Sequence, residues 1–279
     1  MRYFQGFSQL AARALLPTLA MGALTLSACT TTTSPQLRQN LDNTQQKLRA
    51  APVSVIADAC LLRLEVGTSH VLFEQSQAFA NAVALDVRQQ LAARGISAKS
   101  QNVPFICGSL PEKDVTRYDI KLTAEGERQQ LTVYPLKSAT NQLDATTNSA
   151  YLTLLQSLPT LKARDKDLPL TLTLDAVTQQ HLQSHLGSQY VFVIESAGGK
   201  KSFGRGMLEG VASTAVLMAA GANMYAVPQD GARYSIYLID LKANQLLWFK
   251  RNQSVDPTVF KAPVDSYTTP KLLTPLYTD

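Results

Sequence analysis

An alternation of strand and helix patterns between residues 53 and 107 restricts the fold of this chain more than any other feature. Residues 53–65 are rich in β-branched and apolar side chains, which predicts a buried strand. Residues 74–94 carry apolar side chains at every fourth position and are followed by Gly95, which predicts a helix that ends in a left-handed residue. The recurring side chains are Phe79, Val83, Val87 and Leu91. Residues 96–107 again predict a strand, so the folded part begins as a β-α-β unit.

The second half of the chain contains similar signals. Asp175 is suited to cap a helix that runs to Leu186 and stops at Gly187, and the apolar strand 190–194 follows directly. Two hairpins are expected, and the Asn/Thr/Ser-rich stretch 138–149 is expected to be a loop. The hairpin strands are 118–125 with 128–135, and 234–240 with 246–249. These elements predict an α/β (α+β) fold in which helices pack on a mixed β-sheet that starts with β-α-β and ends with a C-terminal hairpin.

The organisation along the chain divides into four parts. We expect a signal peptide at 1–28, a lipidated N-terminus and tether at 29–52, a periplasmic α/β domain at 53–252 and a C-terminal tail at 253–279. The tether contains a short predicted helix at 37–49, and the domain is suited to a subdivision near 138–170. A hydrophobic content of 45% lets about 250 residues bury a sizeable core as one large domain or two small ones.

The N-terminal segment carries the targeting information. Arg2 and Arg13 precede a mostly apolar run from Ala14 to Leu24, and no acidic residue interrupts it. A basic start, a short apolar stretch and small residues before the cut define a secretory signal peptide. The apolar run is shorter than the roughly 20 residues that a membrane-spanning helix needs.

The tetrapeptide Leu26-Ser27-Ala28-Cys29 resembles the lipobox of bacterial lipoproteins. In that family the cysteine receives a diacylglyceryl group and becomes the acylated first residue, which implies palmitate-type acyl chains on Cys29. Several acyl chains together give near-permanent attachment to a membrane. Thr30 stands where an aspartate tends to retain enterobacterial lipoproteins in the inner membrane, so the resemblance implies the outer membrane, facing the periplasm. The alternative is an ordinary secretory peptide with an accidental cysteine.

Two cysteines remain after Cys29, and the expected compartment is oxidising. We predict a disulfide between Cys60 and Cys107, which lie at corresponding depths in the two strands of the β-α-β unit. The alternative is a pair of buried free thiols. A metal site is disfavoured because no Cys-x-x-Cys pair exists.

Charge does not identify a partner. The formal net charge is +5, and the charged residues are scattered without a basic cluster on a helix or among aromatics. We therefore expect no nucleic acid as a partner.

The order of elements resembles periplasmic modules related to the curli secretion lipoprotein and to the N-terminal domain of the Tol-system propeller protein. The residues that carry the resemblance are 185–193 (His-Leu-Gly-Ser-Gln-Tyr-Val-Phe-Val), Leu238-Ile239-Asp240 and Leu247-Trp248, within a span of 53 to 252. The turn of the terminal hairpin lacks the Thr-Gly of that family, and 138–170 has no counterpart in it. The resemblance implies a fold class and no functional residues.

Motifs for catalysis or metal binding are weak. His181 and His185 have the spacing of two metal ligands on one helix face, but no glutamate stands beside the first, and we favour ordinary histidines. Gly198-Gly199-Lys200-Lys201-Ser202 lacks the spacing of a phosphate-binding loop. No nucleophile elbow or hydrolase triad has a candidate centre. We predict no catalytic residues, no metal and no cofactor.

Residues 207–227 form the most unusual stretch, with Glu209 as their one charged residue. As a helix this segment would place small side chains in one stripe, which lets another backbone approach closely. The stripe consists of Gly206, Gly210, Thr214, Leu217 and Gly221. We favour a helix buried against the sheet; self-association or partner docking is the second interpretation, and membrane insertion is the third.

Three functions follow from these observations. The first is a non-enzymatic assembly or interaction component, anchored to the membrane through lipid on Cys29, that contacts itself or other envelope proteins by the glycine-striped helix and a neighbouring sheet edge. The second is a small-ligand or cell-wall-binding module that uses exposed aromatics of the terminal hairpin at Tyr234, Tyr237 and Trp248. The third is an envelope enzyme, which would need a cleft that brings carboxylates such as Asp240 or Glu195 together with a basic group.

Overall fold

The computed structural model describes residues 35–100, 104–122, 126–130, 136–137, 143–202, 230–255, 257–260 and 272–277. The signal peptide, Cys29 and the glycine-striped segment 206–221 lie outside these residues. The compact unit that spans Ser34–Asp279 contains all of them.

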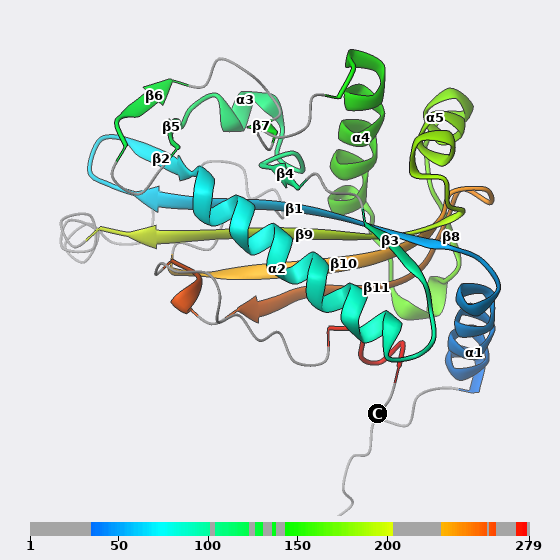
Figure 1. Ribbon diagram of the computed structural model, residues 1–279. Helices are drawn as coiled ribbons and strands as arrows, with labels where there is room; N and C mark the ends of the chain where they lie inside the picture. Colours follow the sequence, from blue (N-terminus) through cyan, green and yellow to red (C-terminus); the bar gives the residue numbers. More distant parts are fainter. Residues whose placement is uncertain are drawn as a thin grey trace, which may run out of the picture. The chain divides into compact units, whose positions relative to one another are not determined.

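The predicted α/β class is confirmed: helices pack on both faces of one mixed sheet (Figure 1). The main path of the sheet among the described residues runs β6-β5-β2-β1-β9-β10-β11-β8, and β3, β4 and β7 attach beside it. β1 and β9 are parallel neighbours, whereas β9, β10 and β11 are antiparallel. The strands are β1 (Val53–Leu64), β2 (Ser69–Leu72), β3 (Ala98–Ser100), β4 (Phe105–Ile106), β5 (Asp119–Lys121), β6 (Arg128–Gln130), β7 (Leu136–Lys137), β8 (Leu170–Thr171), β9 (Tyr190–Lys201), β10 (Asp230–Asp240) and β11 (Gln245–Val255).

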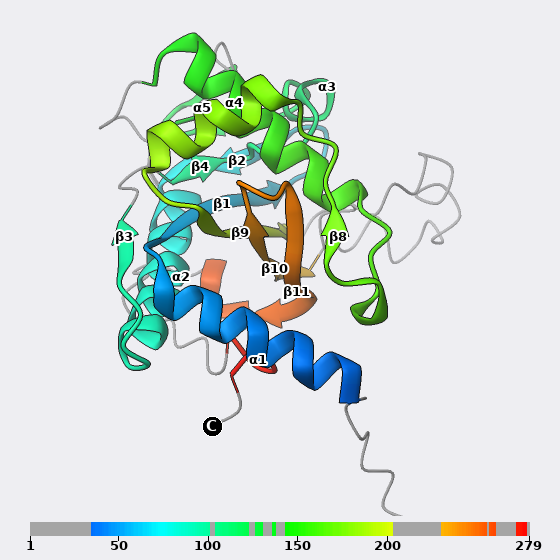
Figure 2. The same ribbon diagram turned by 90° about the vertical axis from the view of Figure 1, so that its right-hand side faces the viewer.

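The helices divide between the two faces of the sheet (Figure 2). α1 and α2 contribute to the core on one face, and α4 and α5 contribute to the core on the other. A smaller third core lies beneath α3 and β4. The helices are α1 (Pro35–Ala50), α2 (Phe73–Ala92), α3 (Glu112–Val115), α4 (Ala145–Ser157) and α5 (Ala176–Leu186), with 3₁₀ turns η1 (Leu158–Thr160), η2 (Asp165–Asp167) and η3 (Pro257–Phe260).

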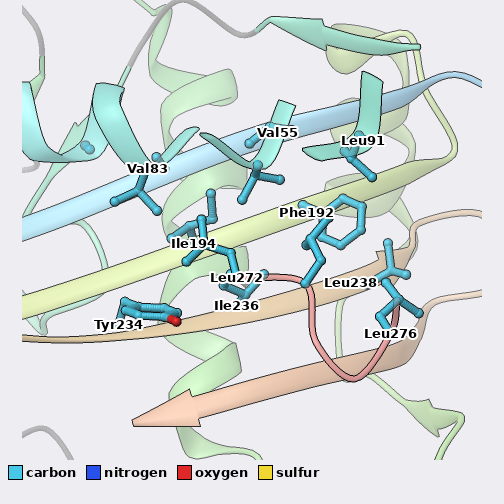
Figure 3. Packing of buried hydrophobic residues seen from close by; sticks show 14 of the residues in the cluster. Val55, Val83, Leu91, Phe192, Ile194, Tyr234, Ile236, Leu238, Leu272 and Leu276 are labelled. Carbon is cyan, nitrogen blue, oxygen red and sulfur yellow. The ribbon is translucent and has the colours of Figure 1, made fainter. Parts of the chain in front are cut away.

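The apolar residues that recur at every fourth position of α2 are buried in the core between α2 and the sheet, which we call the first core. Val83 and Leu91 point from α2 toward Val55 of β1 and Phe192 of β9 (Figure 3). Leu272 and Leu276 reach the same cluster from the end of the chain. Burial of this apolar surface stabilises the fold by roughly 25 cal/mol for each Å² removed from water.

Glycine stops and helix caps are present at the elements that the sequence predicted most clearly. Gly95 has a φ of 74° in the turn that follows α2, where its N–H donates to the backbone oxygen of Ala92, and Gly187 has a φ of 58° at the end of α5. Asp175 caps α5, because its carboxylate accepts a hydrogen bond from the backbone N–H of Thr178 at 2.9 Å. The predicted β-α-β unit and both hairpins are present, although the first hairpin is shorter than expected among the described residues.

Three boundaries differ from the sequence prediction. α1 belongs to the domain and not to a free tether, because Leu41 and Leu48 are buried in its core. The predicted peripheral tail is corrected for Val259 and for Leu272–Tyr277, which pack into the same core. The predicted loop 138–149 contains the start of α4, where Asp144 accepts the backbone N–H of Thr147 at 2.8 Å.

Candidate functional site

A hollow of about 400 Å³ lies along β11. It begins where β8 ends, since β8 pairs with β11 only at Gln245 and Leu246, and it follows β11 from Trp248 to Gln253. We call it the β11 hollow. One wall comes from Leu37 of α1, and its volume lies within the roughly 300–1,000 Å³ typical of ligand pockets. Further lining residues are Leu41, Asp165, Leu168, Phe249, Lys250 and Arg251.

The position of the β11 hollow follows from the sheet. Figure 2 shows β8 beside β11 and α1 crossing below them. Leu41 belongs to the core on one face of the sheet, and Leu168 belongs to the core on the other. The hollow therefore lies along the edge of β11 that β8 leaves uncovered. A further strand could pair with β11 there, next to the end of β8.

A second feature crosses the sheet toward the β11 hollow. Asp58, Glu195 and Ser235 are register partners on β1, β9 and β10, so their side chains lie side by side on one face. Arg251 of β11 completes the series, because it and Asn252 together oppose Ser235 at a β-bulge. We call these four residues the polar row.

Asp58 uses its carboxylate to hold the segment after Cys107. Its two oxygens accept the backbone N–H groups of Gly108 at 2.8 Å and Ser109 at 2.9 Å. Burial raises the pKa of Asp58, and the hydrogen bonds from Ser109 and Gly108 oppose that rise. A side chain at Gly108 would meet Leu155 Cδ1 at 2.9 Å, so the segment packs tightly against α4. Asp58 therefore has a structural role.

Glu195 is the acid of the polar row nearest to a cation. Its side chain is hydrogen-bonded by the Tyr237 hydroxyl, while its Oε1 has no hydrogen-bond partner. Burial raises the pKa of Glu195 well above its ordinary value, and the charge of Asp58 raises it further; the charge of Arg251 and the hydrogen bond from Tyr237 act in the opposite direction. Folding therefore favours the protonated form of this carboxyl relative to the unfolded chain.

We predict that Glu195→Gln reduces the loss of stability as pH rises above the ordinary glutamate pKa of 4.5. A carboxyl whose pKa is raised by folding contributes stability that is fully present below its ordinary pKa near 4.5 and is lost as pH rises through the raised value. Within that window the free energy of unfolding should fall by up to about 1.4 kcal/mol per pH unit in the wild type. Urea unfolding between pH 5 and pH 9 measures the slope. Equal slopes for wild type and variant would contradict a raised pKa of Glu195.

The structure places the predicted disulfide as expected. Cys60 and Cys107 are bonded, with their Cα atoms 4.5 Å apart, beside the polar row. Cys107 has a φ of 58°, a left-handed backbone conformation that is unusual for a residue other than glycine. The bond and the Asp58 contacts hold this turn from two sides.

The two helix histidines have separate surroundings. His181 Nε2 lies 2.8 Å from the hydroxyl oxygen of Thr147, and His185 packs edge-on against Tyr151. The described residues contain no group of three or more His, Cys, Asp or Glu side chains placed to hold a metal ion.

Gly198 and Gly199 lie in the second half of β9, and Gly198 allows β9 and β10 to approach closely. A side chain at Gly198 would lie 2.6 Å from Cβ of Ala232 on β10. Gly198 and Gly199 thus lie within a paired strand, with β1 on one side and β10 on the other. Their backbone forms sheet hydrogen bonds and not a phosphate-binding loop.

The aromatics of the terminal hairpin are not exposed, which corrects the premise of the second functional hypothesis. Tyr234, Tyr237 and Trp248 are all buried. A bulge at Leu247 lets this residue and Trp248 both enter the first core. Among the three aromatics, Trp248 also lines the β11 hollow.

The structure separates the two carboxylates named for the enzyme hypothesis. Asp240 accepts hydrogen bonds from the Gln189 amide and from the backbone N–H of Ala243, so it organises the hairpin turn. Glu195 does meet a basic group, Arg251, but only 8% of Glu195 is exposed.

Sequence reasoning missed two residues of the site. Asp58 interrupts an otherwise apolar strand, and a buried acid in such a run is a usable signal. Arg251 gave no signal, because its place depends on the bulge at Asn252, whose φ is 53°. Without the sheet order, Arg251 is indistinguishable in the sequence from an ordinary charged residue.

None of the helices in the described part of the chain combines the length and the apolar composition needed to cross a bilayer. Residues 207–227 lie outside that part. No protein family model matches the chain, and no curated protein or solved structure is detectably similar to it.

Proposed function

We propose that the chain is a lipid-anchored component of the bacterial cell envelope, held on the periplasmic face of the outer membrane through Cys29, with a domain that binds another envelope protein. The role is non-enzymatic. The β11 hollow is the observation that carries the proposal, because it occupies the side of β11 where a partner strand would extend the sheet.

The compartment is supported by two independent features. The lipobox-like tetrapeptide ends at Cys29, and the disulfide between Cys60 and Cys107 suits an oxidising environment. Cys29 and Pro35, where α1 begins, are six residues apart, so an extended tether spans at most about 20 Å. The wall of the β11 hollow that α1 supplies therefore stays close to the membrane surface.

A binding role fits the polar row better than catalysis. Asp58 uses both carboxylate oxygens for the turn after Cys107, and Glu195 is almost fully covered. A general acid or base must come within hydrogen-bond reach of a substrate. The accessible chemistry is instead that of the β11 hollow, whose lining combines apolar side chains with the two cations Lys250 and Arg251 and one acid, Asp165.

The occupant that we propose is an extended segment of another envelope protein. Main-chain pairing gives such a segment affinity, and pockets for alternate side chains give it specificity. Trp248 and Phe249 provide aromatic surface on β11, and Leu37 provides apolar surface on α1. Lys250 and Arg251 favour a segment that carries acidic groups.

Site-specific photo-crosslinking in intact cells tests the proposal. A photoreactive residue at Gln253 or Leu37, which line the β11 hollow, is expected to capture the same segment of one other envelope protein. The matched control is Ser254, an exposed neighbour on the same strand, and Val177 on α5, which is 74% exposed, is the distant control. Neither control should give this adduct.

Each other result would overturn the proposal in a recognisable way. An adduct with twice the mass of the chain indicates self-association. An adduct with lipid indicates an amphiphile in the β11 hollow. Equal capture from Gln253, Ser254 and Val177 indicates random collision.

A further inference from the structure

Arg251 is brought to the β11 hollow by an irregularity of the sheet. Tyr234 pairs with Gln253, while Ile236 pairs with Lys250, so two residues of β11 oppose the single Ser235. The backbone N–H of the second bulge residue, Asn252, donates to Ser235 Oγ at 3.2 Å. Bulges of this kind change the direction of a side chain and are frequent beside functional sites.

The guanidinium of Arg251 is held by aromatic rings. Its central carbon lies 4.6 Å from the ring centre of Phe249 and 5.4 Å from that of Tyr237. The group also donates a hydrogen bond to the Tyr237 hydroxyl oxygen. Stacking and this bond fix the guanidinium in orientation at the side of the β11 hollow.

Two nitrogens of the same guanidinium are unsatisfied. Nε and Nη2 of Arg251 are buried and have no hydrogen-bond partner. The N–H groups of these two nitrogens point in parallel, which is the geometry that binds both oxygens of one carboxylate. A buried donor of a charged group without a partner destabilises the fold, and a bound carboxylate would remove that cost.

The nearby acids do not supply that carboxylate. Glu195 accepts a hydrogen bond from Tyr237 and its Oε1 has no hydrogen-bond partner, so it does not bind Nε or Nη2 of Arg251. Both oxygens of Asp58 accept N–H groups of the turn after Cys107. Asp165, which is exposed, lines the β11 hollow together with the second cation, Lys250. Among the described residues, no carboxylate therefore binds Nε and Nη2 of Arg251.

We propose that Arg251 is the specificity-determining anchor of the β11 hollow and that it binds a carboxylate carried by the partner's extended segment. This inference rests on the proposed function. The carboxylate belongs either to an aspartate or glutamate side chain or to a free C-terminus, and both present the same two oxygens to the fork of Nε and Nη2.

The test measures capture by the photoreactive residue at Gln253 in four backgrounds of the full chain. R251Q is expected to lower the yield at least tenfold, because it removes the charge and the paired donors. R251K is expected to lower it several-fold, because lysine keeps the charge without the fork. K242Q removes one positive charge from the exposed hairpin turn outside the β11 hollow and should leave the yield unchanged.

Mass spectrometry of the captured segment identifies the source of the carboxylate. If an acidic side chain supplies it, an Asp→Lys or Glu→Lys change in the partner abolishes capture, and R251E restores it. If a free C-terminus supplies it, a two-residue extension of the partner abolishes capture. R251K decides the question if thermal unfolding shows that R251Q is not folded.

The two proposals fail in different ways. An unchanged yield of the same adduct in R251Q and R251K refutes the anchor and leaves the proposed function in place. Absence of any protein adduct at Gln253 in the wild type refutes the proposed function itself. Equal losses in R251Q and K242Q indicate an unspecific effect of charge and overturn the anchor.

Discussion

Asp58→Ala is expected to lower the free energy of unfolding by about 3–5 kcal/mol, because the Asp58 side chain is fully buried and its hydrogen-bond partners cannot turn to water. The substitution leaves the buried N–H groups of Gly108 and Ser109 without an acceptor. It also removes the volume of the carboxylate beside α4. Both effects act on a site that water cannot readily fill.

Denaturant unfolding with matched variants measures this effect. Asp58→Asn keeps the volume but exchanges one acceptor oxygen for a donor, so it separates lost hydrogen bonding from the cavity. Asp42→Ala removes an exposed acid from α1 and is expected to change stability by less than about 0.5 kcal/mol. A loss below 1 kcal/mol in Asp58→Ala would mean that the turn after Cys107 finds other acceptors.

Loss of the disulfide is expected to destabilise the domain by about 4 kcal/mol. Cys60 and Cys107 are 47 residues apart, and the chain-entropy account gives roughly this value for a loop of that length. The double variant Cys60→Ala/Cys107→Ala tests it against wild type under oxidising conditions. Labelling of free thiols should find both cysteines unreactive until a reductant is added. Reaction of both without reductant would contradict the bond in the native protein.

The two substitutions should not be additive. Asp58 and the disulfide hold the same left-handed turn at Cys107, so removal of either one loosens the contacts of the other. A double-mutant cycle is expected to give a coupling free energy of about 0.5–3 kcal/mol. This coupling distinguishes a shared clamp from two independent supports.

Sequence patterns identified elements wherever local periodicity and caps agree. α2 and α5 follow from regular apolar spacing, an Asp175 cap and a glycine stop. α1 was assigned to the tether because it has few apolar residues, and Leu41 and Leu48 gain their partners only from distant parts of the chain. α4 begins in a polar stretch whose one usable signal is the Asp144 cap.

The candidate site was much less accessible to sequence reasoning. Glu195 was named as a carboxylate that could meet a basic group, but its partners come from three other strands. Arg251 joins them only because β1, β9, β10 and β11 are adjacent in this order. Strand order and bulge position depend on long-range pairing, which a single sequence does not encode in any local pattern.

The packing of α1 and of Leu272–Tyr277 into one core has a consequence for the order in which the domain matures. Under the proposed export through a membrane, the N-terminal end emerges first, so α1 would leave the membrane before its neighbours at 272–277. Gln45 Nε2 then donates to the backbone oxygen of Leu276 across 231 positions. Until that closing contact forms, apolar surface of the first core stays uncovered, and the nascent domain is exposed to aggregation and to proteases. On this proposal export and folding are coupled, and the last apolar segment completes the first core.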